Sequence, residues 1–132
     1  MKIAAVTEDG ITVSQHFGRA PYYLVVTIED GEAVSKEKRD KMGHHHLAGS
    51  EHSETAHGER HGYDAAAQSR HSMMAQSIDD CQILLAGGMG WGAYDSVKKA
   101  GIEVIVTDVE NIDEAVKLYL QGKLHNLMER LH

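Results

Sequence analysis

The sequence predicts an α/β fold with a mixed five-stranded sheet flanked by helices. Three extended segments stand in a row in the N-terminal part, at residues 2–6, 22–29 and 32–38. The C-terminal part instead alternates extended and helical segments, in the order 83–86, 93–100, 102–107 and 112–120. Hairpin-connected strands pair antiparallel, whereas strands joined through a helix pair in parallel with right-handed crossovers. We therefore expect an antiparallel N-terminal hairpin and parallel C-terminal strands in one sheet.

The N-terminal hairpin is indicated by its alternation and its turn. Leu24, Val26 and Ile28 fall on one face of a segment rich in β-branched and aromatic residues. The pair Asp30-Gly31 then provides a two-residue hairpin turn. The strand that follows is polar and charged, which is typical of an edge strand protected from pairing with another chain.

The apolar run at 83–86 is short enough for a strand buried on both faces. Four glycines follow within six residues, and the helix at 93–100 ends before Gly101. A tight glycine turn at a helix N-terminus can bind a negatively charged group, because the first N–H groups of a helix have no internal partner. An ordinary βα turn with nothing bound has the same pattern, so both interpretations stay open on this stretch alone.

The helix at 112–120 begins with a capping box formed by Asn111 and Glu114 and ends near Gly122. An amphipathic C-terminal piece follows, with apolar positions Leu124, Leu127, Met128 and Leu131. This piece favours a homodimer, whereas the polar edge strand favours a monomer, and both stay open.

Residues 39–63 form a predicted His-rich loop insertion. Leu47 is nearly the only large apolar residue there, so the segment cannot bury enough surface to order itself. Helix resumes at 65–77, with Asp64 as its N-cap.

Seven of the ten histidines are candidate metal ligands, namely His44, His45, His46, His52, His57, His61 and His71. Imidazole with nearby carboxylates suits Zn²⁺, Ni²⁺, Cu²⁺ or Fe²⁺. Their spacing matches no defined zinc motif, so the signal is compositional. A solvated loop that binds metals only adventitiously stays open.

A length of 132 residues predicts one domain over 1–132. The formal net charge of −7 argues against a nucleic-acid binder. We see no signal peptide and no transmembrane run. The single cysteine, Cys81, excludes an internal disulfide, suits a reducing cytoplasm and is expected in the core. We expect a cytoplasmic protein that binds neither nucleic acid nor membrane.

Two motifs carry a family resemblance. They are His16-Phe17-Gly18-Arg19-Ala20-Pro21 after the first strand and Gly87-Gly88-Met89-Gly90 after the buried strand. A closing pattern follows at 114–124, and the chain opens with Met-Lys-Ile-Ala. Outside the His-rich loop, the chain resembles the dinitrogenase iron–molybdenum cofactor biosynthesis family. That family includes the NifX-like and NafY-like carriers, NifB C-terminal domains and the orange proteins.

The resemblance implies a ribonuclease-H-like fold and a carrier, not an enzyme. Its cargo would be an anionic metal–sulfur cluster that contains molybdenum with iron or copper. The implied cofactor-binding residues are His16, Phe17, Gly18, Arg19, Gly87, Gly88, Met89 and Gly90. A cofactor-assembly or acceptor protein would be the partner. Many family members have no nitrogenase role, so the family name does not identify the cargo.

The chemistry of these residues fits a cluster that brings its own sulfides. Arg19 offers charge and a planar fork of donors, His16 can ligate or donate, and the glycine turn offers backbone donors. The opposing interpretation is a turn in which Phe17 fills the core and Arg19 pairs with a surface carboxylate. Trp91, next to the glycine turn, could either cover a ligand or fill the pocket.

Two other functional classes stay open. A divalent-metal chaperone or storage protein would act through the His-rich loop instead of the glycine turn. A nuclease or phosphotransferase needs clustered carboxylates for two metals, and Glu8, Asp9 and Asp108 have no obvious fourth partner. No nucleophile–base pair is evident, so we expect a binding protein.

Overall fold

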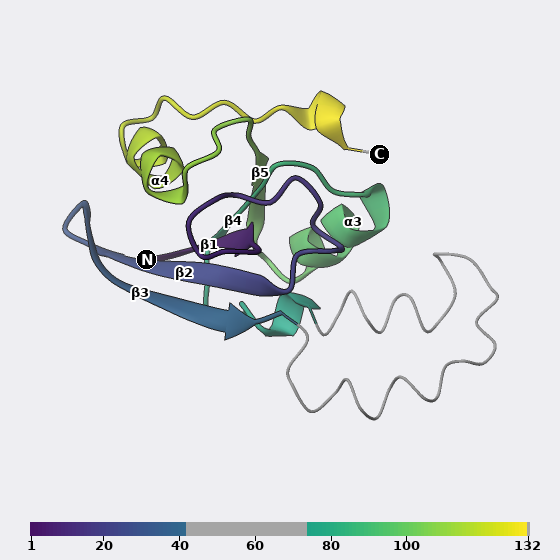
Figure 1. Cartoon of the computed structure of the whole chain (residues 1–132), viewed down its shortest axis with the longest axis horizontal. Coiled ribbons are helices and arrows are strands. Elements are labelled where there is room, and N and C mark those ends of the chain that lie inside the picture. Colours follow the sequence, from purple (N-terminus) through teal and green to yellow (C-terminus); the bar gives the residue numbers. More distant parts are fainter. Residues whose placement is uncertain (42–73, 132) are drawn as a thin grey trace, which may run out of the picture.

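A computed structural model describes residues 1–41 and 74–131 (Figure 1). Within these ranges, five strands form one sheet in the order β3-β2-β1-β4-β5. The strands are β1 (Lys2–Thr7), β2 (Tyr22–Glu29), β3 (Glu32–Asp40), β4 (Ile83–Ala86) and β5 (Glu103–Val106). They are accompanied by α3 (Trp91–Lys99), α4 (Ile112–Leu120) and the 3₁₀ helix η1 (Met128–Arg130). No helix in the described part of the chain has the length and apolar composition needed to cross a membrane.

The two halves of the sheet meet at β1. This strand pairs antiparallel with β2 on one side and parallel with β4 on the other. β3 continues the antiparallel side and β5 the parallel side. The predicted mixed five-stranded sheet, with its antiparallel N-terminal hairpin and parallel C-terminal strands, is therefore confirmed. The ribonuclease-H-like assignment stays a prediction.

The central strand β1 is apolar from Ile3 to Val6, where both of its faces are covered. Ala4 and Val6 belong to one core cluster, which α3 covers through Val97. Ile3 and Ala5 belong to the opposite cluster, which α4 covers. An unbroken apolar run is the pattern expected of a strand buried on both faces.

Several element boundaries differ by one or two residues from the sequence-based expectation, and two of these differences have a structural reason. α3 begins at Trp91, earlier than predicted, because Gly90 adopts the extended conformation of an N-cap (φ −84°, ψ 161°). β3 continues to Asp40, since its pairing with β2 extends that far. The predicted start of the His-rich loop at residue 39 is therefore wrong, and residues 42–63 of that loop lie outside the described residues. Most of the predicted helix at 65–77 also lies outside them, and residues 74–76 are helical.

The outer edge of β5 is covered by the C-terminal segment. Asn126 Oδ1 accepts a hydrogen bond from Val106 N (2.9 Å), and Asn126 Nδ2 donates to Val104 O (3.2 Å). Leu127 N donates to Val106 O (2.8 Å). A side-chain amide thus takes the place of a neighbouring strand, and this edge is not open to pairing with another chain.

An ion pair fastens the end of β3 to the segment before β4. Arg39 Nη1 and Nη2 lie 2.7 and 2.9 Å from the two carboxylate oxygens of Asp80. The same guanidinium donates to Ser77 O (2.9 Å). The hydrogen bonds from Arg39 hold the pKa of the Asp80 carboxyl well below its ordinary value of 3.8. The ionised carboxylate is the form that is stabilised, so this contribution is present above pH 3.8 and is lost as the pH falls.

We expect Asp80→Asn to lower the free energy of unfolding at neutral pH by about 0.5–1 kcal/mol, because the pair is partly exposed. The difference in the free energy of unfolding between this variant and the wild type should become smaller when the pH falls below the ordinary carboxyl pKa. Urea unfolding at pH 7 and pH 3 measures both effects. Asp79→Asn is the matched control, since Asp79 is an exposed neighbour. If Asp79→Asn lost as much stability as Asp80→Asn, the stabilising role of the contact between Arg39 and Asp80 would be contradicted.

Candidate functional site

The two motifs meet at the carboxyl end of β4. Residues 14–17 run alongside the glycine turn, and two backbone hydrogen bonds join them. Gly87 N donates to Ser14 O (2.8 Å), and Phe17 N donates to Gly88 O (3.1 Å). Segments far apart in the sequence therefore form one junction, at the sheet edge where open α/β sheets bind ligands.

Gly87 and Gly88 are required by this close approach. A Cβ atom at Gly88 would lie 2.7 Å from Gln15 O, and one at Gly87 would lie 3.0 Å from Gln15 Cα. Neither glycine has a positive φ, so the requirement comes from packing and not from backbone conformation. The Gly87 N–H is already bonded to Ser14, so a ligand would have to use other donors of the turn.

The helix that starts at this turn has an uncompensated N-terminus. The N-cap of α3 is Gly90, so no side chain accepts a hydrogen bond from the first N–H groups of the helix, and no acidic residue lies in its first turn. α4 shows the contrast, because its N-cap Asn111 accepts a hydrogen bond from Glu114 N and its first turn is acidic. The partial positive charge of α3 therefore remains available to an anion.

The first motif is a turn anchored by its aromatic residue. Arg19 N donates to His16 O (3.0 Å). Phe17 is 1% exposed and belongs to the core. The interpretation of this motif as a turn in which Phe17 fills the core expects this burial. His16, Gly18 and Arg19 are exposed. No carboxylate in the described ranges forms an ion pair with Arg19, so the predicted surface pairing is not observed there.

Two cations that sequence reasoning missed contact the two motifs. Lys41 is 1% exposed, and its Nζ donates to Phe17 O and lies 4.2 Å from the centroid of the Phe17 ring. Burial lowers the pKa of Lys41 to about 8. Arg130 Nη1 donates to Gly87 O (3.2 Å). Lys41 follows the charged strand β3, and Arg130 lies in the amphipathic C-terminal piece, so no local pattern could have selected them.

The structure also shows where Met89, Trp91 and Cys81 lie. Met89 is 1% exposed and packs in the core. Trp91 is 48% exposed and packs edge-on against Tyr94, with ring centroids 5.6 Å apart, so it does not fill the turn. Cys81 is buried, and burial raises the pKa of its thiol to about 12. The interpretation of Cys81 as a core residue is confirmed, since it is buried and belongs to the core cluster.

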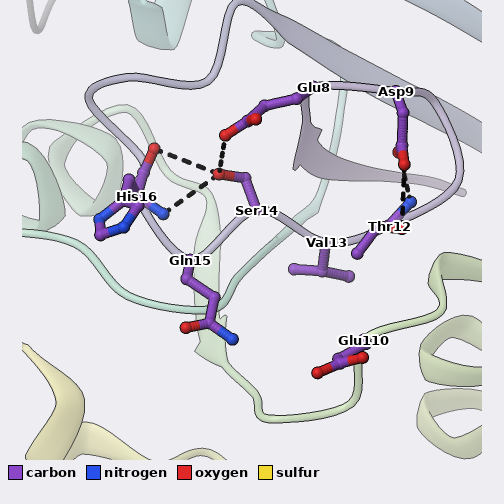
Figure 2. Close-up of a pocket in the computed structure, with 8 residues that line it drawn as sticks. All are labelled: Glu8, Asp9, Thr12, Val13, Ser14, Gln15, His16 and Glu110. Carbon is purple, nitrogen blue, oxygen red and sulfur yellow. Dashed lines mark hydrogen bonds between the residues drawn. The ribbon is translucent and has the colours of Figure 1, made fainter.

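The loop after β1 also lines an acidic cavity of about 400 Å³ (Figure 2). Its lining is formed by Glu8, Asp9, Thr12, Val13, Ser14, Gln15, His16 and Glu110. Backbone N–H groups of Thr12 and Ile11 lower the pKa of Asp9 to about 2. Figure 2 shows His16 at the end of the cavity opposite Asp9. The three carboxylates make this cavity unfavourable for an anion.

The seven predicted metal ligands are not among the described residues. His44, His45, His46, His52, His57, His61 and His71 fall outside the described residues, so their assignment stays a prediction. Within residues 1–41 and 74–131, no group of three or more His, Cys, Asp or Glu side chains could hold a metal ion.

We expect Gly88→Ala to lower the free energy of unfolding by about 1–3 kcal/mol, because its Cβ would overlap Gln15 O. Gly18→Ala is the matched control, since nothing lies within 4 Å of a Cβ at Gly18. We expect that variant to stay within about 0.5 kcal/mol of the wild type. Urea unfolding of both variants measures the difference, and a Gly88→Ala protein as stable as Gly18→Ala would refute the close packing.

The chain is similar to known proteins over most of its length. Residues 1–122 match the sequence model of the family described as "Dinitrogenase iron-molybdenum cofactor". A relative from Methanocaldococcus jannaschii, the uncharacterized protein MJ0580, is 32% identical over 124 residues, which cover 94% of this chain and 89% of the relative.

Two solved structures show the same fold. The crystal structure of PH0822 has a TM-score of 0.66 and 25% identity, and covers 96% of both chains. The apo form of the orange protein from Desulfovibrio gigas has a TM-score of 0.63 and 26% identity, and covers 96% of this chain and 92% of the other. Both motifs lie inside the matched residues, and the chain therefore belongs to the dinitrogenase iron–molybdenum cofactor family.

Proposed function

We propose that the protein is a non-catalytic carrier of an anionic metal–sulfur cluster that contains molybdenum with iron or copper. The observation that carries this proposal is the contact between the two family motifs beside the uncapped start of α3. The proposed binding residues are His16, Phe17, Gly18, Arg19, Gly87, Gly88, Met89 and Gly90. Family membership and the similarity to the orange protein support cofactor binding.

The charges around the junction support an anionic cargo. The chain carries a formal net charge of −7, yet Arg19, Lys41 and Arg130 all lie in or against the two motifs. A cluster brings its own sulfides, so it needs positive potential and N–H donors more than many protein ligands. In this proposal Arg19 donates to the cluster, and the His16 imidazole ligates a metal or donates a hydrogen bond.

The residues of the two motifs divide into two roles. Phe17 and Met89 are each 1% exposed, so we propose that they hold the backbone of the motifs in place. His16, Gly18 and Arg19 are exposed and can face the cargo. Gly87 and Gly88 let the two segments come together. Replacing an exposed residue should therefore change binding with little effect on folding.

A second candidate function is a divalent transition-metal chaperone or storage protein. It is favoured by the clustering of seven of the ten histidines in residues 44–71. In this case bare Zn²⁺, Ni²⁺, Cu²⁺ or Fe²⁺ would bind without sulfide, and the glycine turn would be structural.

The remaining parts of the proposal concern setting and partners. We propose a cytoplasmic protein, a monomer or homodimer, that meets a cofactor-assembly or acceptor protein and binds neither nucleic acid nor membrane. A ribonuclease-H-like fold is the architecture that we propose for the sheet.

The test is metal and acid-labile sulfide analysis, with a visible spectrum, of untagged protein purified anaerobically. We expect molybdenum or iron together with sulfide and charge-transfer bands. Arg19→Gln should weaken cluster retention roughly tenfold, since it removes a charge-assisted contact. Replacing the seven loop and helix histidines by alanine should leave the cluster content unchanged.

Lys99→Gln is the control for the loss of one positive charge, because Lys99 is exposed at the far end of α3. We expect it to retain the cluster like the wild type. Zinc, nickel or copper without sulfide, lost when the histidines are replaced, would overturn the cluster proposal and favour the second candidate.

A further inference from the structure

We propose that residues 127–131 form one wall of the cargo site and that Arg130 is a further anion-binding residue. This inference rests on the proposed function, since it concerns the same junction. It adds a part of the chain that neither motif contains and that lies beyond residue 122, where the family match ends.

The C-terminal segment is held in register on both sides of Arg130. Leu127 N donates to Val106 O (2.8 Å) before it, and Leu131 forms a parallel bridge with Met89 after it. Leu131 is buried in the same core cluster as Met89. In Figure 1 the segment passes the end of β5 and finishes on the side of α3. The position of the arginine is therefore set by the fold.

The guanidinium lies directly on the glycine turn. Arg130 Nη1 donates to Gly87 O (3.2 Å), three positions before the N-cap Gly90. A guanidinium has five N–H donors, so this single hydrogen bond leaves most of them for a ligand. Arg130 is half-buried, and an anion bound there would be less screened than on an open surface.

The charge of Arg130 has no counter-ion in the described ranges. Arg39, another partly buried arginine, shows what a structural role looks like in this fold, because it forms ion pairs with both Asp80 and Glu37. Arg130 forms no ion pair with any carboxylate of residues 1–41 and 74–131. A guanidinium that donates to a carbonyl of the turn and pairs with none of these carboxylates has its charge available for an anionic ligand.

A planar fork at this point would also select the ligand. Arg130 can donate two parallel N–H groups to two atoms of one anion, which a lysine ammonium cannot do. The ligand class is therefore an anion with two adjacent acceptor atoms, such as the sulfides or oxygens of a tetrahedral molybdenum centre.

The test uses apo-protein and two probes, tetrathiomolybdate and molybdate, with binding followed by equilibrium dialysis and amide NMR shifts. We expect Arg130→Met to weaken binding of the preferred probe roughly tenfold or more, because it removes a charge-assisted hydrogen bond. Arg130→Lys should recover only part of that affinity. Lys99→Met, with the same change in charge at an exposed position, should bind within about twofold of the wild type.

Thermal unfolding of the apo variants separates an effect on binding from an effect on folding. We expect Arg130→Met and Arg130→Lys to have the same unfolding temperature. If the wild type binds a probe and either Arg130→Met or Arg130→Lys binds it with the same affinity, the inference is overturned and the carrier proposal stands. If the wild type bound neither probe, both the carrier proposal and the role of Arg130 would fall.

Discussion

The site depends on two backbones that touch without a side chain between them. A Cβ atom at Gly88 would lie 2.7 Å from Gln15 O, so the loop after β1 can rest on the end of β4 only if that position is glycine. The hydrogen bonds of Ser14 and Phe17 to the turn follow from this approach. Phe17 and Ala20 then enter the core, whereas His16, Gly18 and Arg19 stay exposed. The packing of the loop against the glycine turn thus determines the positions of the exposed residues of the first motif.

Charges of opposite sign lie around the same loop. Glu8, Asp9 and Glu110 line the cavity, whereas Lys41 and Arg130 contact the backbones of the two motifs. An acidic chain can in this way offer a small positive region to an anion and still repel anions elsewhere on its surface. A bare divalent cation would have the reverse preference.

The sheet was predictable because its signals are local. The apolar run of β4, the alternation of β2 and the Asn111 cap are short-range patterns, and each appears where it was expected. The two motifs could also be found from their residues. Lys41 and Arg130 could not, because only the tertiary fold brings a strand end and a C-terminal helix against these turns. The extra length of β3 likewise depends on pairing with β2 and not on its own sequence.

The most direct test of this account is an amide NMR titration of the uniformly labelled apo-protein with tetrathiomolybdate. Backbone donors at the junction should respond first, because they are the groups that would meet the anion. We predict that the largest shifts fall on Gly18, Arg19 and residues 88–92, with little change at Glu8, Asp9 and Glu110. Shifts confined to the histidine-containing stretch at 44–71, or no saturable shifts at all, would contradict a cargo site at the junction of the two motifs.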